Sequence, residues 1–290
     1  PTINNGAKYM AATLYTGNGA TQTIANTVNN ISFQPDFVWV KNRGTAGTDH
    51  GLFDTVRGAT KRLASNLTSA ETTEVNSLTA FTSTGFTVGA AQDFNQNGVG
   101  LVGWQWLAGA GSSSSNTSGS ITSTVSVNQT AGFSVVTYTG NGGSNQSVGH
   151  GLGATPGMVI IKDRTLGTTN WLVHHQSQPT GYTLYLNLTN AQDSGTSQWG
   201  TSAQTSSVFY IGYTAGATGS NNSGDNYVAY CFAPIAGYSA FGTYTGNGSA
   251  DGPFVYTGFR PRWVMTKSSS GVENWLMVDT SRDTYNPESN

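Results

Sequence analysis

Few residues in this chain have the types and spacing that chemistry requires. The clearest pattern is a D-x-N-x-N-G run whose polar members are Asp93, Asn95 and Asn97. Oxygen atoms at alternate positions before a glycine open a calcium-binding loop, and a glutamate at the twelfth position closes it. Here the twelfth position is Trp104, and the corresponding run at 219–224 has no carboxylate at its start. We therefore predict a Gly/Asn turn that needs no cofactor, with calcium as the alternative.

Histidine and carboxylate side chains do not form a repeated catalytic set. The four histidines include one adjacent pair, His174 and His175, which would lie on opposite faces of a strand and cannot bind one metal together. The carboxylates of Asp49 and Asp54 could meet as a glycosidase pair. The repeat described below has Asn170 and His175 in those places. Because HExxH, paired-cysteine and GxSxG patterns are also missing from the sequence, we predict that the chain is not an enzyme.

Aromatic side chains are the remaining candidates for a binding site, at 11% of the chain. Proteins hold sugars with an exposed ring face and a few polar groups. The aromatic residues in or near Gly/Asn/Thr-rich loops, predicted as glycan contacts, are Trp171, Trp199, Tyr182 and Trp275. Those inside strand-like runs, predicted as core, are Trp39, Trp104, Trp106, Trp263 and Tyr230.

The elements that must position these side chains are repeated. The sequence YTGNG occurs at 15–19, 138–142 and 244–248. Each copy is followed by a proline, an apolar run and a lysine six residues after the proline, at 35–41, 156–162 and 261–267. Two motifs in the same order three times indicate a tandem array of one module. Gly-Asn-Gly predicts a tight turn after a strand, and the proline-to-lysine segment predicts a buried strand whose lysine reaches solvent.

The apolar segments are short, β-branched or aromatic, and separated by Gly, Asn, Ser or Pro, which is typical of sandwiches and barrels. We predict an all-β fold of tandem β-sandwich, jelly-roll-like modules, with two complete copies and a partial third. The expected parts are module one over 1–108, a Gly/Ser-rich linker with a candidate edge strand over 109–132, module two over 133–234 and the partial third module over 235–290. The first half of the linker should be flexible. The strongest helical signal, of one or two turns, covers Leu67–Val75.

Composition argues against several classes of partner. Charged residues make up 9% of the chain and the formal net charge is −2, whereas about 25% is usual in soluble proteins. Without a basic face the chain is a poor candidate for binding nucleic acid. No apolar run reaches the roughly 18 residues of a membrane helix, so we predict no membrane insertion. The single cysteine, Cys231, lies in a strand-like run and should be buried.

Four segments carry a resemblance to a known family. They are PDFVWVKNR (Pro35–Arg43), LASNLTSAE (Leu63–Glu71), VGHGLGATPGMVIIKDR (Val148–Arg164) and NYVAYCFAPIAGYSAFGTYTGNGSADGPFVYTGFRPRWV (Asn226–Val264). They resemble a repeat domain of undefined function in virion structural and tail-fibre proteins of marine tailed bacteriophages, such as cyanophages and pelagiphages. The resemblance covers nearly the whole chain and brings no catalytic residues. Members usually continue further, which implies that the closing half-module is truncated or completed by another chain.

The resemblance implies a bacteriophage virion structural protein on the particle surface, in the tail fibre or adhesion apparatus, that contacts the host. The implied partners are other virion proteins, further copies in a homo-oligomer such as a trimer, and a host surface glycan. Low charge, abundant Gly, Asn, Ser and Thr, and modules in tandem suit this role. The alternatives are a capsid decoration protein outside the phage head and a free carbohydrate-binding module.

Overall fold

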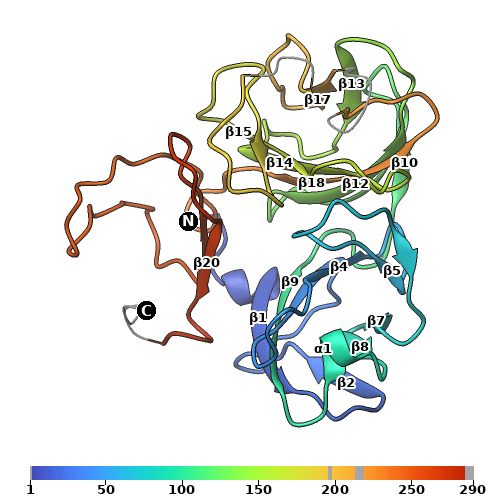
Figure 1. Cartoon of the computed structure of the whole chain (residues 1–290), viewed down its shortest axis with the longest axis vertical. Helices are drawn as coiled ribbons and strands as arrows, with labels where there is room; N and C mark the ends of the chain where they lie inside the picture. Colours follow the sequence, from blue (N-terminus) through green and yellow to red (C-terminus); the bar gives the residue numbers. More distant parts are fainter. Residues whose placement is uncertain (1, 195–197, 213–218, 285–290) are drawn as a thin grey trace.

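The computed structural model describes residues 2–194, 198–212 and 219–284 (Figure 1). The predicted all-β fold is confirmed, because antiparallel sheets hold nearly all of the regular structure. Helical structure in the described residues is limited to one 3-10 turn, η1 (Gly6–Lys8), and one α-helical turn, α1 (Gln92–Asn95). The helical signal at Leu67–Val75 was wrong: this segment is mostly irregular and contains the short strand Thr72–Thr73, and its two glutamates bind arginines.

Residues 2–108, module one, form two facing sheets. The large sheet has the order β1 (Met10–Thr16), β9 (Gly100–Trp106), β3 (Phe37–Asn42), β4 (Gly51–Asp54). The small sheet has the order β2 (Gln22–Ala25), β8 (Gly85–Val88), β7 (Leu78–Thr82), and a short pair joins β5 (Lys61–Arg62) to β6 (Thr72–Thr73). The first strand pairs with the last and the second with the one before it, as in a jelly roll.

Module two, residues 133–234, repeats this arrangement. Its large sheet, extended at one edge by two linker strands, has the order β10 (Ser114–Asn116), β11 (Ser123–Asn128), β12 (Phe133–Thr139), β18 (Asn226–Phe232), β14 (Met158–Asp163), β15 (Leu172–His175), β16 (Leu184–Tyr185). The facing pair is β13 (Gln146–Gly149) with β17 (Val208–Ile211). Trp39 lies opposite Trp104 in module one, and Ile160 lies opposite Tyr230 in module two. These matching registers define equivalent positions in the two modules.

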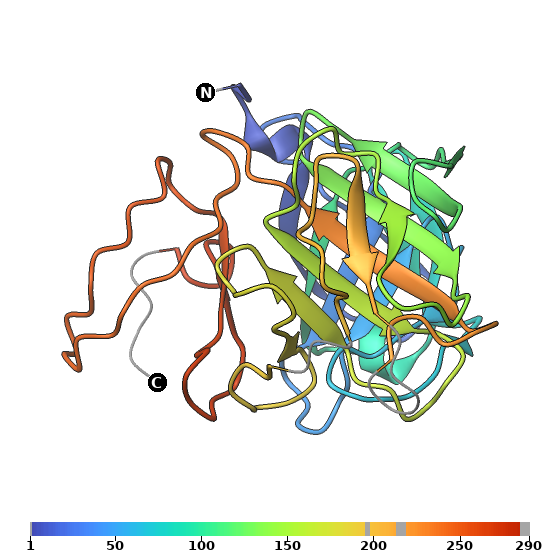
Figure 2. The same cartoon turned by 90° about the horizontal axis from the view of Figure 1, so that it is seen from above.

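Residues 235–284, module three, contain one hairpin, β19 (Trp263–Thr266) with β20 (Leu276–Asp279). Trp263 lies opposite Asp279, as Phe37 lies opposite Asp54 and Met158 opposite His175. The hairpin is therefore equivalent to β3–β4 and β14–β15. In Figure 1 it lies to the left of modules one and two, which are stacked one below the other, and Figure 2 shows the strands of module two overlying those of module one.

The Gly/Ser-rich segment between modules one and two is anchored at its start, where we expected a flexible linker. The carboxylate of Asp36 accepts hydrogen bonds from the backbone amides of Ala108, Ala110 and Gly111 at 2.7–2.8 Å. Further along, β11 pairs with β12 and so continues the sheet of module two. A buried carboxylate that binds several amides is a strong local constraint, so the connection between the modules is fixed by Asp36.

Candidate functional site

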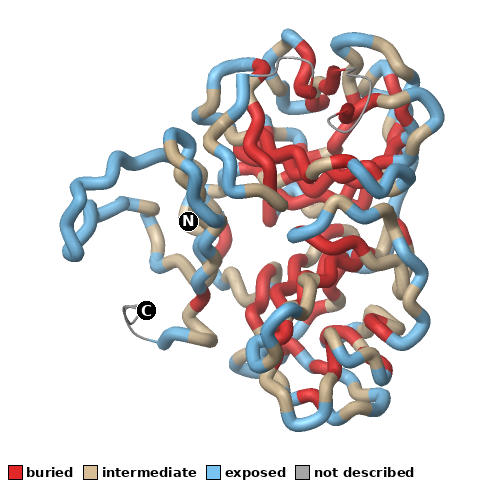
Figure 3. Tube along the Cα trace, in the orientation of Figure 1, coloured by how far each residue is buried: buried red, intermediate tan, exposed pale blue. Residues whose placement is uncertain are grey.

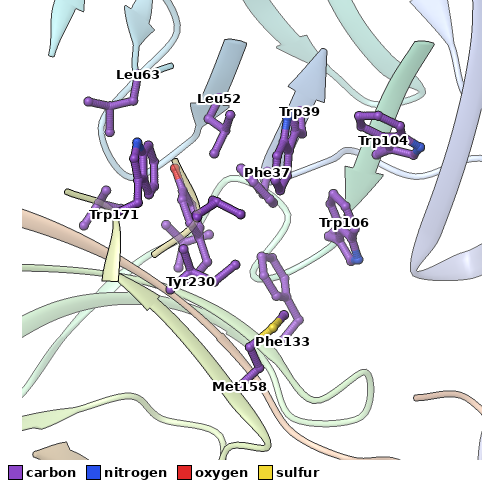
Figure 4. Close-up of a cluster of buried hydrophobic side chains, with 14 of the residues drawn as sticks. Phe37, Trp39, Leu52, Leu63, Trp104, Trp106, Phe133, Met158, Trp171 and Tyr230 are labelled. Atoms are coloured by element: carbon purple, nitrogen blue, oxygen red, sulfur yellow. The ribbon is translucent and has the colours of Figure 1, made fainter. Parts of the chain in front are cut away.

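The two large sheets face each other across a buried apolar cluster that we call the junction (Figure 4). Strand β3 shows how it forms: Phe37 and Trp39 pack into the junction, whereas Val38 and Val40 pack against the small sheet. In module two, Met158 and Ile160 of β14 likewise pack into the junction. A strand buried on both faces reads as a continuous apolar run, which explains FVWV and MVII.

Aromatic rings dominate the junction and come from both modules. The ring of Phe37 stacks on Tyr230 with 4.1 Å between centroids, and on Trp106 at 5.2 Å. Phe133 lies 6.1 Å from Phe37. From module three, Trp263 meets Trp106 edge to face at 5.4 Å. Such ring pairs contribute about 0.5–1.5 kcal/mol each beyond the area they bury, so the junction joins all three modules.

One set of polar contacts across the junction occurs twice. The Tyr230 hydroxyl of module two donates to Asp54 Oδ2 of module one at 2.9 Å. At the equivalent strand position in module one, Trp104 Nε1 donates to Asp279 Oδ2 of module three at 3.0 Å. Each aspartate also binds the arginine three residues later, Arg57 or Arg282. The same contact therefore runs from module two to one and from module one to three.

A second repeated contact connects the modules on the other side of the same hairpins. Trp171 Nε1 of module two donates to the Ala64 carbonyl of module one at 2.8 Å. Trp275 Nε1 of module three donates to the Tyr185 carbonyl of module two, also at 2.8 Å. Both tryptophans occupy the same position of their hairpins, immediately before β15 and β20. Together the two sets show three modules arranged as a ring, each touching the other two.

Charged groups at the junction are paired across the module boundary. Glu71 binds Arg57 at 3.0 Å and accepts two hydrogen bonds from Arg164 of module two at 2.9 Å. Burial alone would raise the Glu71 pKa, but the hydrogen bonds and charge of Arg164 and Arg57 outweigh it and hold the pKa below its usual value. Glu71 is therefore an ionised link between two modules.

In module one, His50 occupies the position equivalent to Trp171 and Trp275. His50 Nδ1 accepts a hydrogen bond from Trp39 Nε1 at 2.8 Å. Burial, reinforced by the nearby charge of Lys41, lowers the His50 pKa to about 4. The neutral ring accepts at Nδ1, so it carries its proton at Nε2 and keeps one donor there.

The glycan contacts predicted from the sequence are only partly exposed. Trp171 and Trp199 are fully buried, at 0% and 1% exposed, which corrects the expectation that their rings face a sugar. Trp171 packs in the junction, and Trp199 packs in the core of module two. Tyr182 and Trp275 are half-buried, and the indole N–H of Trp275 is already bonded to a carbonyl of module two. The loop residues around these tryptophans suggested exposure, but the junction covers Trp171.

Asn95 of the calcium pattern makes a contact with the first Gly-Asn-Gly turn that we call the turn lock. The Asn95 carboxamide oxygen accepts from the backbone amide of Asn18 in the first Gly-Asn-Gly turn at 2.9 Å, and its amide donates to the Gly89 carbonyl at 2.8 Å. Asp93 pairs with Arg62 at 3.2 Å, and Asn97 is exposed. Asn95 and Asp93 therefore bind different groups. Residues 2–194, 198–212 and 219–284 contain no group of three or more His, Cys, Asp or Glu suited to a metal ion.

The same lock recurs in module two, where Asn221 binds the second Gly-Asn-Gly turn. Its side-chain oxygen accepts from the Asn141 amide at 2.8 Å, and its side-chain amide donates to the Gly143 carbonyl at 2.7 Å. The sequence contained the signal, because Asn95 and Asn221 stand at equivalent distances before the last strand of their modules. Both are fully buried. The repeated turn is thus a structural feature tied to the last strand.

Sequence reasoning missed the role of the repeated lysines. Instead of reaching solvent, Lys162 is fully buried and its Nζ donates to the Asp163 carbonyl at 2.7 Å and to Thr169 Oγ1 at 2.8 Å. Lys41 Nζ donates to the Thr48 carbonyl at 2.7 Å. Lys162 and Lys41 therefore hold together the loops that follow β14 and β3, the third strands of their modules. Burial lowers the Lys162 pKa to about 8, against the opposing effect of Asp163.

Four of the five aromatic residues predicted as core, and Cys231, are buried as expected. Trp39, Trp104, Trp106, Tyr230 and Cys231 are buried, while Trp263 of module three is half-buried. No helix among the described residues is long and apolar enough to cross a membrane. The polar groups of Tyr230, Trp104, Trp171 and Trp275 are occupied by contacts between modules, and these contacts hold the modules together.

Comparison with known proteins gives a family. A family model described as a domain of unknown function, DUF7483, matches residues 5–290. The match spans all three modules. No curated protein and no solved structure matches the chain.

Proposed function

This chain belongs to the DUF7483 family, and we propose that it is a structural protein of a bacteriophage particle, in the tail fibre or adhesion apparatus. The observation that carries the proposal is the junction, in which three copies of one module are bound to each other through buried aromatic rings. A protein built to transmit load or present loops needs stable contacts between modules, and this chain uses its largest side chains for them.

The use of its ionisable groups supports the same role. Asp54 and Asp279, which would be available to a catalyst, bind arginines and the aromatic donors of a neighbouring module. His50 and His174 have pKa values lowered to about 4 by burial, so both stay neutral near pH 7. These groups serve assembly of the chain, and the virion location itself comes from the resemblance of the repeated segments.

We also propose that contact with the host surface, with a glycan as the expected ligand, uses loops at the edges of the modules. Trp275 and Tyr182 are the two aromatic candidates that keep partial exposure. A homotrimer of chains, which the resemblance implies, stays a prediction. The ring of three modules described above is made within one chain.

The proposal is tested by finding the chain in the particle. Particles of the source virus are purified by density gradient, washed in high salt and analysed by quantitative mass spectrometry, with a replication enzyme of the same virus as the control for cell contamination. We expect the chain to co-purify with the tail at a few dozen copies or fewer per particle. Hundreds of copies would instead identify a capsid decoration protein, and a chain that washes away with the replication enzyme would refute a virion role.

Antibody labelling then places the chain on the particle. Binding at the tail tip or fibres is expected. Label confined to the head would contradict the tail-fibre assignment while leaving a structural role in place.

A further inference from the structure

We propose that module three presents a docking site for one further β-rich segment, the second half of a third module, which inserts a strand beside β19 and closes the ring. The site consists of the free edge of β19, the extended segment 239–245 and the outer face of the hairpin. This inference rests on unpaired backbone, exposed apolar side chains and unsatisfied polar groups. It holds whether or not the protein belongs to a virion.

The first observation is an unpaired strand edge. In module one β9 lies between β1 and β3, and in module two β18 lies between β12 and β14. In module three the equivalent of the first strand is 239–245, which contains the third YTGNG tyrosine, and the equivalent of the third strand is β19. Within the described residues β19 pairs with β20 alone, and 239–245 forms no strand. An open edge of this kind accepts an added strand.

The second observation is an uncovered apolar face. Val264 of β19 is 36% exposed, whereas the equivalent Val38 and Val159 are 0% exposed. Val278 of β20 is 38% exposed, whereas the equivalent Phe53 is 0% exposed. In the complete modules the small sheet covers these positions. Figure 3 shows the contrast between the mostly exposed trace of module three and the buried strands of the other two. Exposed apolar side chains at positions that are buried in the other two modules indicate a partner surface.

The third observation is at the place where the third contact of the tryptophan set is missing. Trp171 and Trp275 each donate to a carbonyl of the preceding module. The equivalent His50 lies beside residues of module three. His50 lines a cavity of about 260 Å³ together with residues of modules two and three, among them Asn187 and Trp275. Its Nε2 donor can serve a backbone carbonyl there, as the indole N–H groups do at the other two sites.

The fourth observation is on module two, at the position of the two arginines. Arg57 and Arg282 are held against the aspartate of their hairpin and meet an aromatic donor from the next module. The equivalent Gln178 has a buried Nε2 with no hydrogen-bond partner. A buried amide donor of this kind costs free energy unless it is satisfied, and the last strand of a complete third module would lie beside it.

The chemistry of the occupant follows from these four features. It is a segment whose last strand alternates bulky and small residues as Gly100–Trp106 and Asn226–Phe232 do, with an aromatic donor at the position of Trp104 and Tyr230. A second copy of this chain does not offer such a strand, because β9 and β18 are central and buried in their own sheets. We therefore assign the site to a segment of the same kind as the second half of modules one and two, which ends in β9 or β18.

A chimera tests this assignment. A second copy of Gly58–Ala108 is joined after Arg282, because Arg57 and Arg282 are equivalent. The matched control is the same chimera with Val102→Asp and Trp104→Asp in the appended copy, which places two charges on the face that should enter the junction. We expect amide hydrogen exchange at Trp263–Thr266 to slow by at least about tenfold in the chimera, and dye binding to exposed apolar surface to fall. The control should match the unmodified chain.

The proposal is overturned if β19 exchanges as fast in the chimera as in the unmodified chain, or if the charged control protects β19 equally well. A measurement on the unmodified chain keeps the test decisive if the chimera does not fold. There, amides of β19 should exchange faster than those of the equivalent β14. Equal protection of β14 and β19 would show that the face is already covered, and would overturn the proposal.

Discussion

Tyr230→Phe removes one hydroxyl and keeps the aromatic ring, which makes it a specific probe of the junction. The hydroxyl donates to Asp54 Oδ2 at 2.9 Å and accepts from Arg57 Nη2 at 3.1 Å. Hydrogen bonds to charged groups contribute about 1.5–3 kcal/mol to stability. After the change Asp54 keeps its ion pair with Arg57, and Arg57 Nη2 keeps the Leu52 carbonyl at 2.9 Å. We therefore expect the low end of that range, about 1.5–2 kcal/mol.

The assay is urea unfolding followed by tryptophan fluorescence and by circular dichroism, so that coincidence of the two curves establishes a single transition. The midpoint should fall while the dependence on urea concentration stays constant, because the surface exposed on unfolding is unchanged. A double-mutant cycle with Asp54→Asn then measures the coupling between Tyr230 and Asp54 directly. We expect a coupling free energy above about 1 kcal/mol.

The matched control is Tyr227→Phe in the same cycle. Tyr227 lies three residues earlier on β18, is equally buried and faces the core of module two, where its hydroxyl accepts from the Asn222 amide at 2.9 Å. It shares no partner with Asp54, so their coupling should be within about 0.5 kcal/mol of zero. A cost below about 0.5 kcal/mol for Tyr230→Phe, or equal couplings for the two tyrosines, would refute the role given to the junction contact.

Three further outcomes follow from the contacts of single residues. Asn95→Ala should lower the unfolding free energy by about 2–4 kcal/mol, because several buried amides and carbonyls lose their partner; a loss under 1 kcal/mol in urea unfolding would contradict the turn lock. Glu71 has a folded-state pKa below its usual 4.5, so its contribution to the free energy of unfolding is present above about pH 4.5 and is lost as the pH falls through the lower folded value. Glu71→Gln should therefore flatten the dependence of the unfolding free energy on pH between about pH 5 and 2. An unchanged dependence would exclude the links to Arg57 and Arg164. Trp171→Ala should cost about 3–5 kcal/mol in thermal or urea unfolding, whereas a sugar-stacking role would leave stability intact and abolish only glycan binding.

Local patterns in the sequence were sufficient for the all-β fold and for much of the core. The run from Pro35 to Lys41 predicted a buried strand and is β3, and the predicted burial of Trp104 and Tyr230 is confirmed. These predictions succeed because alternation, β-branching and turn residues act over a few neighbouring positions. The continuous FVWV and MVII runs also indicate a sheet covered on both sides, because their apolar side chains point to both faces.

What failed depends on residues far apart in the chain. Trp171 stands among loop-forming residues, and its burial is decided by the Ala64 carbonyl of another module. Lys162 was expected in solvent because lysine is rarely buried, yet the loop after β14 supplies the oxygen atoms it needs. A sequence signal for the ring did exist in the matching DTVR and DTSR runs that begin at Asp54 and Asp279. Its meaning required knowing which strand of which module meets each aspartate.

Because the three modules are encoded separately, one position of the ring can mutate without changing the other two. At the hairpin aspartate the chain has Asp54, His175 and Asp279, and at the aromatic donor it has Trp104 and Tyr230. An assembly of three identical chains would receive every substitution in triplicate. Fusion into one polypeptide therefore permits divergence at a single contact, so that an unequal trio of interfaces can evolve while the common architecture is kept.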